Sequence, residues 1–167
     1  PGNRPLRDRP LTVADRWILS RTERVTAEVN DALGRYEFAE AASVLYQFTW
    51  HAFCDWYIEL AKPALQGTDT ERGDTTRAVL IHVLDRVLRL LHPFIPFITE
   101  EIWHRLPGVP EDAFLMLAAY PAAGAEDLAA EAEMEPVIAV VEGIRNVRGE
   151  SNLPPLQRIR AVVQTDD

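Results

Sequence analysis

Apolar residues recur at helical spacing in the first strongly patterned part of the chain, residues 12–34. Thr12, followed three residues later by Asp15, is close to a capping box, which marks the start of a helix. Gly34 stands where the pattern ends, and glycine commonly terminates helices. The same periodicity, interrupted by proline- and glycine-containing segments, predicts four further helices. They cover about residues 38–64, 75–91, 96–106 and 126–149.

The segments between these helices are predicted loops, with a polar one at residues 68–74 and a longer one at 107–124. Residues 158–164 alternate apolar with polar positions and then become apolar, which is typical of an opening strand. The predicted fold is therefore all-α, a bundle of about five helices with a short C-terminal strand or extended tail. We expect a linker at 1–11, the bundle at 12–153 and the start of a small α/β element at 154–167. Because one strand cannot form a sheet and the first residue is Pro1, we expect a piece of a larger protein.

Composition and charge narrow the class of protein. The chain has 167 residues, 47% of them hydrophobic, which fits one globular domain. No apolar run approaches the ~20 residues that span a bilayer, and the lone Cys54 fits a reducing cytoplasm. The net charge of −9 is the wrong sign for a nucleic-acid binder. Arginines nevertheless crowd the first 24 residues and carboxylates crowd 126–135, so a locally basic surface stays open.

The second predicted helix combines aromatic and charged residues. Spacing its residues 100° apart separates two arcs. The apolar arc contains Phe38, Ala42, Leu45, Tyr46, Thr49, Trp50, Ala52, Phe53, Trp56, Tyr57 and Leu60. The polar arc contains Gln47, His51, Asp55, Glu59 and Lys62. Phe48 and Ile58 fall within the polar arc, and two interpretations are open: a central helix packed on both sides, or a face on which Ile58 and Glu59 meet a ligand.

No catalytic constellation stands out. Glu101 and His104 have the E-x-x-H spacing of di-metal bundles, but no second copy exists, and a surface pair is the better interpretation. His51 and Cys54 lie one turn apart without an orienting third group, which favours a structural thiol. Phosphate-binding glycine motifs and zinc-type cysteine clusters are absent from the sequence. We therefore expect no catalytic or metal-ligating residues and no cofactor in this chain.

Residues 144–155 form the second candidate site. Arg145 and Arg148 are one turn apart near the end of the fifth predicted helix. Arginines at that position can cap helix carbonyls and complement the helix dipole. They can equally form a clamp for phosphate or carboxylate. The spacing leaves both interpretations open.

Four segments together resemble the anticodon-binding helical domain of valyl-tRNA synthetases, which are class I aminoacyl-tRNA synthetases. The segments are residues 14–21, 53–62, 90–103 and 144–155. The His-Pro-x-x-Pro-Phe-x-x-Glu-Glu-x-Trp pattern from His92 is shared more loosely by related synthetases. Phe-Cys-Asp-Trp-Tyr at 53–57 and the Arg-Asn-x-Arg ending at 145–148 are more specific to the valyl enzyme.

The resemblance implies that this domain holds the anticodon loop of tRNA(Val). The catalytic domain, which uses ATP with magnesium, and the editing domain would be its partners in the same chain. The resemblance places anticodon contacts at Ile58 and Glu59 and in a helix that would precede Pro1. Elementary chemistry agrees, because a carboxylate accepts from base amines and a cation binds phosphate. The predicted tRNA-binding residues are Asp55, Ile58, Glu59, Lys62, Arg145 and Arg148.

Two other functions are consistent with the sequence. One is a helical protein-interaction module that binds no RNA and uses the unpaired apolar residues and the acidic fifth helix. The other is a ferritin-like metal bundle, for which the E-x-x-H at Glu101 is the sole support.

Overall fold

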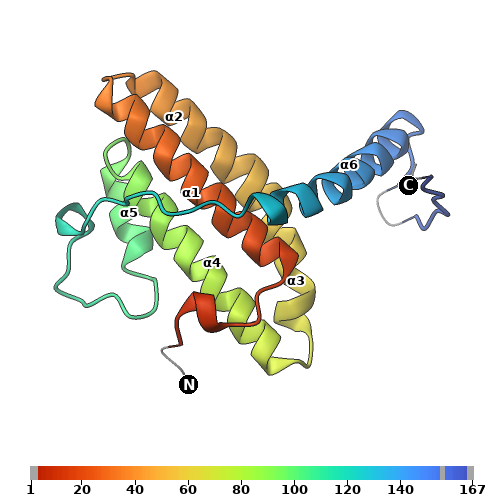
Figure 1. Ribbon diagram of the computed structural model, residues 1–167, viewed down its shortest axis with the longest axis horizontal. Helices are drawn as coiled ribbons and strands as arrows, with labels where there is room; N and C mark the ends of the chain where they lie inside the picture. The colour runs from red at the N-terminus through yellow and green to blue at the C-terminus, as the bar shows by residue number, and fades with distance from the viewer. Residues whose placement is uncertain (1–3, 155–156, 165–167) are drawn as a thin grey trace.

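The computed structural model describes residues 4–154 and 157–164, and Figure 1 shows them as an all-helical assembly. Within these residues the chain forms five helical runs, and no strand is present. The runs are α1 (Val13–Gly34), the continuous series α2 (Phe38–Gln47), η2 (Phe48–Tyr57) and α3 (Ile58–Gln66), then α4 (Thr70–Leu91), α5 (Pro96–Trp103) and α6 (Leu128–Glu150). Short 3₁₀ turns, η1 (Leu6–Asp8) and η3 (Leu115–Leu117), lie in the N-terminal segment and in the long loop.

Capping explains where the helices begin. The Thr12 Oγ1 accepts from the Asp15 N–H at 3.2 Å while the Asp15 carboxylate accepts from the Thr12 N–H at 2.9 Å, so the predicted capping box is confirmed. α4 begins five residues before the predicted start, inside the segment predicted as a loop. The reason is Asp69, whose side chain accepts from the Arg72 N–H at 3.0 Å and caps the helix there.

The predicted second helix is continuous, but its middle ten residues, η2, form a π-helix. π-helical hydrogen bonds join i to i+5, so each residue turns the chain by less than in an α-helix. A single 100° spacing therefore misplaces the buried face. Tyr46 and Trp50 are exposed, so their predicted positions on the core-facing arc were wrong, whereas the burial of Phe48 fits the interpretation of a helix packed on both sides. Phe38 and Leu60, which were also assigned to the core-facing arc, are exposed as well, so those predictions were wrong.

The core lies where α1 contacts α2, η2, α4 and α6. Its fully buried side chains come from four elements, namely Ile18 and Val29 of α1, Leu45 of α2, Tyr57 of η2, and Val79, Val83 and Leu90 of α4. A second, smaller cluster joins Leu88 of α4 to Trp103 of α5 and Leu115 of η3. The Trp103 indole N–H donates to Asp85 at 2.7 Å, which fixes α5 against α4. The bundle thus presents a rigid framework on which the outer helical faces are displayed.

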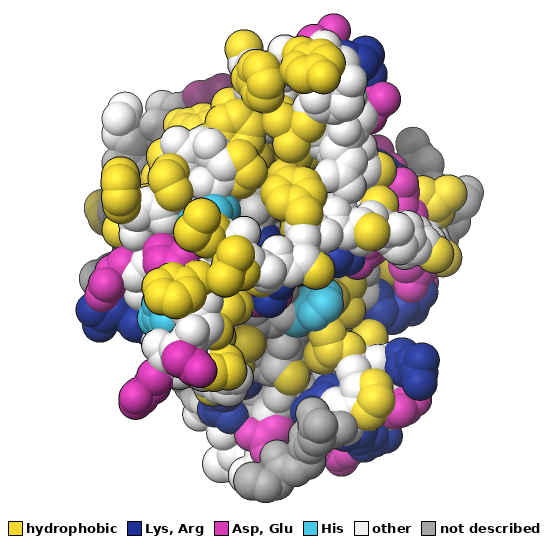
Figure 2. All heavy atoms as spheres, turned by 90° about the vertical axis from the view of Figure 1, so that its left-hand side faces the viewer, with side chains coloured by type: hydrophobic (Ala, Val, Ile, Leu, Met, Phe, Trp, Pro, Cys, Tyr) yellow, Lys and Arg dark blue, Asp and Glu magenta, His cyan; other side chains and the backbone are white. Residues whose placement is uncertain are grey.

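The two ends of the bundle differ. The first part of α6 lies against α1, and its later part extends away from the other helices (Figure 1). On the other side, exposed hydrophobic side chains gather around α5 and η3 (Figure 2). They include Ile95, Phe97, Ile98, Phe114, Met116 and Leu117.

The predicted C-terminal strand does not form. Residues 157–164 are irregular and exposed. A strand requires a partner strand for its backbone hydrogen bonds, and the described part of the chain supplies none. Among the described residues, none of the helices is both long enough and apolar enough to cross a membrane.

Candidate nucleic-acid interface

The arginines of α1 form ion pairs with carboxylates of the same chain. Arg16 pairs with Asp127 at 2.8 Å, and Arg24 pairs with Glu126 at 2.7 Å. The Glu131 carboxylate forms ion pairs with Arg24 at 3.0 Å and Arg21 at 3.7 Å. It also accepts a hydrogen bond from the Ser20 hydroxyl at 2.6 Å. Arg16, Arg21 and Arg24 thus face the acidic cluster across the α1–α6 interface, whereas Arg4 pairs with Glu71 elsewhere. They do not form the basic surface that the sequence left open.

The predicted RNA-contacting residues of the second run lie mainly on its outward face. Asp55, Glu59 and Lys62 are exposed, whereas Ile58 is half-buried against the core. The Lys62 ammonium donates to both oxygens of Glu59, at 2.6 and 2.7 Å. His51 lies 3.4 Å from the Asp55 carboxylate. Surface pairs of this kind contribute about 0–1 kcal/mol each, so a ligand can replace them at little cost.

Arg145 joins the two candidate segments. Its guanidinium carbon lies 4.9 Å from the centre of the Trp56 ring, in a cation–π contact between α6 and η2. Trp56 adjoins Asp55 and is one turn from Glu59 along the same run. Segments about ninety residues apart in the sequence therefore form one surface, which their spacing alone could not reveal.

Arg148, unlike Arg145, contacts backbone carbonyl groups. Its guanidinium donates to the Pro154 carbonyl at 2.6 Å and to the Gln157 carbonyl at 2.9 Å, so it binds backbone oxygens beyond the helix end. Arg145 and Arg148 nevertheless line one open cleft of about 520 Å³, together with Asn152 and Leu153. An anion clamp formed by the two arginines stays a prediction.

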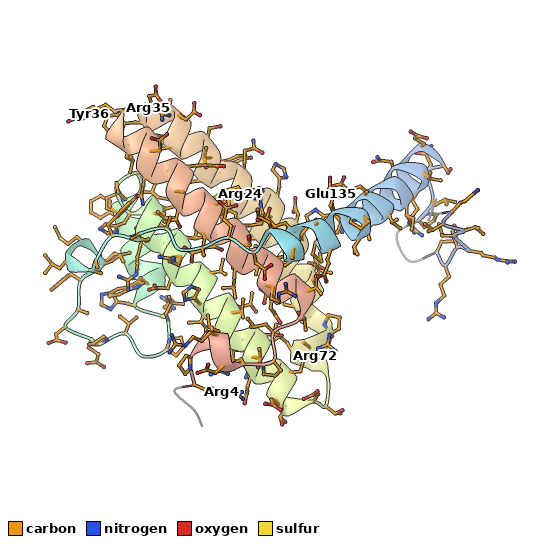
Figure 3. All side chains as sticks on the ribbon, viewed as in Figure 1. Arg4, Arg24, Arg35, Tyr36, Arg72 and Glu135 are labelled. Atoms are coloured by element: carbon orange, nitrogen blue, oxygen red, sulfur yellow. The ribbon has the colours of Figure 1, made fainter. Side chains whose placement is uncertain are left out.

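A second cleft, of about 570 Å³, lies between α1, η2 and α6. Its walls include Trp17, Arg21, His51 and Trp56. Figure 3 labels two more of its lining residues, Arg24 on α1 and Glu135 on α6. The cleft adjoins the outward face through His51 and Trp56, so aromatic and charged groups border it on three sides.

The candidate nucleophile Cys54 and the candidate metal ligands Glu101 and His104 do not form reactive or metal-binding sites among the described residues. Burial, and then the neighbouring Asp55 carboxylate, raise the pKa of the Cys54 thiol, which disfavours the thiolate that a nucleophile requires. Glu101 pairs with Arg105 at 2.5 Å, and His104 lies 3.2 Å from Glu100. The two residues of the E-x-x-H pattern therefore pair with different neighbours, and the described residues contain no cluster of three or more potential metal ligands.

Sequence reasoning missed the exposed aromatic residues of this surface. Tyr46 and Trp50 were assigned to the core, yet both face solvent on the run that carries Asp55 and Glu59. Trp50 lies within the π-helix, which the fixed 100° spacing does not follow, and Tyr46 lies one turn before it near the end of α2. The Arg145–Trp56 contact was also missed, because it depends on the path of α6 across the bundle.

Comparison with known proteins gives a consistent result. The family described as "Anticodon-binding domain of tRNA ligase" matches residues 15–163. The valine–tRNA ligase of Syntrophotalea carbinolica is 52% identical over 165 residues, covering 98% of the chain and 18% of that protein. Those of Geobacter sulfurreducens and Carboxydothermus hydrogenoformans are 51% and 47% identical, over 92% and 97% of the chain and 18% of each protein. The chain thus spans about a fifth of the length of these curated relatives.

Proposed function

Because the chain belongs to the family of tRNA-ligase anticodon-binding domains and is similar throughout to that region of valine–tRNA ligases, we propose that it binds the anticodon stem-loop of tRNA(Val). The observation that carries this proposal is the contact of Arg145 with Trp56. It joins the α6 arginines to the outward face of Asp55, Glu59 and Lys62 in one surface. That surface offers acceptors, cations and rings within reach of one RNA loop.

Each group on this surface has a defined chemical use. Proteins that read RNA sequence contact unpaired loop bases by stacking and by hydrogen bonds to their edges. The Glu59 carboxylate, and Asp55 beside it, can accept from an exocyclic amine. Lys62, released from Glu59, can bind a phosphate. The exposed part of Ile58 supports the edge of a base.

The α6 arginines contribute a planar group and charge. The Arg145 guanidinium already stacks on Trp56 by one face, so its other face can receive a base. Arg148 lines the same cleft and adds positive potential there. Together they place two positive charges on a domain whose net charge is −9.

The rest of the ligase reaction would lie in other parts of a longer chain. We place the aminoacylation step, with its ATP and magnesium, in a separate catalytic domain, and the bundle at residues 12–153 between a linker at 1–11 and a following element at 154–167. The exposed apolar residues around α5 and η3 suit contact with the catalytic and editing domains. A tRNA-charging role implies a cytoplasmic location.

Binding of a fluorescent tRNA(Val) anticodon stem-loop to this chain tests the proposal directly. We expect weak binding whose affinity falls steeply with salt, because Lys62 and Arg145 displace about two counterions, which gives a slope of log K against log salt of about −1.5. A stem-loop with the same stem and an unrelated loop should bind more weakly. Equal affinity for both loops, or no binding of either, contradicts anticodon recognition.

A second test uses a full-length valine–tRNA ligase that carries this domain. Glu59→Ala should lower the rate of tRNA charging and leave valine-dependent ATP–pyrophosphate exchange unchanged, since the exchange step needs no tRNA contact. Glu40→Ala, at an exposed position of α2, is the matched control and should change neither activity. Equal loss of both activities in Glu59→Ala contradicts the assignment of Glu59 to RNA contact.

The second candidate function is a protein-interaction module, favoured by the apolar residues around α5 and η3. It predicts that the chain binds no stem-loop at low salt. The first experiment therefore separates the two functions.

A further inference from the structure

Tyr46 and Trp50 form an exposed aromatic pair, a name kept below for these two residues. Their side chains are large, and they are 57% and 53% exposed. The ring centres are 6.4 Å apart with a tilt of 57°. The pair spans the junction of α2 and η2, so a rigid helix holds both rings outward.

The core of this run does not need the pair. Its buried face is filled by other aromatic residues, Phe48, Phe53, Trp56 and Tyr57. Burying an aromatic side chain usually stabilises a fold substantially. Two rings left outside on a rigid helix are therefore available to a partner.

The surroundings of the aromatic pair are polar. Ser43, Gln47, His51 and Asp55 are the exposed residues around it on the same run. A protein-docking surface is typically a contiguous apolar patch, such as the one around α5 and η3. Aromatic rings surrounded by hydrogen-bonding groups are instead typical of protein surfaces on which nucleobases stack.

We propose that the aromatic pair is a stacking platform for unpaired bases of the RNA loop. The pair continues the outward face of Asp55, Glu59 and Lys62, with His51 between them in contact with Asp55 at 3.4 Å. Trp50 and Glu59 are nine residues apart on one continuous helical run. Bases of the RNA loop would thus stack on the aromatic pair at one end of the face. At the other end, the carboxylates of Asp55 and Glu59 would accept hydrogen bonds from base edges. This inference rests on the proposed anticodon function.

Tryptophan fluorescence tests the platform, because Trp50 is the exposed member of the four tryptophans. Trp17, Trp56 and Trp103 are only 6%, 9% and 5% exposed. Adding the tRNA(Val) anticodon stem-loop should quench the exposed emission and protect it from acrylamide. Trp50→Phe should remove this response and keep the affinity within about twofold, because a ring remains.

Affinity measurements complete the test. Trp50→Ala should weaken stem-loop binding roughly 5- to 10-fold, the lower part of the range for a lost base–aromatic stack. The factor should be the same at low and high salt, whereas Lys62→Ala should reduce the magnitude of the salt slope by about 0.7. Tyr46→Leu provides a second, smaller loss. Phe97→Ala, at an exposed ring of α5, is the control and should change nothing.

The outcomes separate the two proposals. If the stem-loop binds by anisotropy while Trp50 emission and the affinity of Trp50→Ala are unchanged, the platform is wrong and the anticodon function stands. If a blunt duplex of the same stem protects Trp50 equally, the platform is also wrong, because a duplex offers no unpaired loop base. If no stem-loop binds the unaltered chain, the anticodon function itself fails. Circular dichroism of each variant verifies that it folds.

Discussion

Tyr57 links η2 to the first turn of α1. Its hydroxyl donates to the Asp15 carboxylate, which is buried and also accepts from the Thr12 N–H and hydroxyl. Burial, and then this hydrogen bond, raise the pKa of Tyr57 above its ordinary value, so the phenol stays protonated as a donor. One side chain thus closes a network that fixes the π-helix against the helix start.

Tyr57→Phe should lower the free energy of unfolding by about 1–3 kcal/mol, because the buried carboxylate loses a donor while the ring packing is kept. Urea unfolding at neutral pH measures the change. Tyr46→Phe is the matched control, since Tyr46 is exposed, and should change stability by less than about 0.5 kcal/mol. Equal effects of the two substitutions contradict the role given to the Asp15 bond.

His82 makes stability depend on pH. Burial, and then the Arg86 cation, lower the pKa of His82 below 6.5, although Glu23 and Asp85 act in the opposite sense. Between the two pKa values the unfolded chain binds a proton that the folded chain does not. The contribution of neutral, buried His82 to the free energy of unfolding is therefore fully present above about pH 6.5, and it is lost as the pH falls below that value.

Urea unfolding of the unaltered chain and of His82→Gln, between about pH 7 and pH 5, measures this contribution. The free energy of unfolding should fall with decreasing pH in both proteins, because carboxylates also titrate. It should fall less steeply in His82→Gln. The same slope in both would mean that His82 titrates alike in the folded and unfolded states.

At the scale of elements, α6 depends on Glu131 for its attachment to α1. This carboxylate is largely buried. It accepts a hydrogen bond from Ser20 and forms ion pairs with Arg21 and Arg24. Beyond it, Pro136 interrupts the hydrogen bonding of the helix. The first half of α6 is therefore an anchored segment, and the second half, which carries Arg145, extends from it.

Glu131→Gln should destabilise the chain by about 1–3 kcal/mol, because three donors lose a charged acceptor in a partly buried site. Amide hydrogen exchange should show faster opening of α6 than of α4. Glu133→Gln is the control, because that carboxylate is exposed and 4.0 Å from Arg16, and it should change stability by less than about 0.5 kcal/mol. A larger effect at Glu133 would contradict the anchoring role of Glu131.

The sequence predicted the helices well where local signals decide them. The capping box at Thr12 and the proline at Pro96 mark true helix starts. It failed where the outcome depends on other parts of the chain. The 100° spacing of an α-helix does not hold through the π-helix η2, so it placed Trp50 inside although Trp50 is exposed. Residues 158–164 have an alternating pattern, but the described part of the chain offers them no partner strand.

The candidate site was predictable in part for the same reason. Asp55, Glu59 and Lys62 are neighbours on one helical run, and their shared outward face follows from local spacing. The Arg145–Trp56 contact and the pairing of Arg24 with α6 depend on which helices become neighbours. A single sequence does not contain that information in its periodicity.

At the scale of the whole molecule, the proposed RNA-binding surface and the exposed apolar face lie on different sides. The later part of α6, with Arg145, projects from one side of the bundle, and α5 and η3 lie on the other (Figure 1). The apolar face around α5 includes Phe97 and Leu117, which are 91% and 78% exposed. Exposed apolar patches of this kind bind proteins or cause self-association. The proposed RNA-binding surface and the apolar face around α5 therefore share no residues.

The double variant Phe97→Ser/Leu117→Ser tests this separation. It should bind less of an apolar dye such as anilinonaphthalene sulfonate and should self-associate less in sedimentation experiments, because two large apolar side chains leave the surface. The free energy of unfolding should stay within about 0.5 kcal/mol of the original, since neither side chain is buried. Stem-loop affinity should also be unchanged. A parallel loss of RNA affinity would show that the two surfaces are coupled, and a large loss of stability would show that these residues pack in solution.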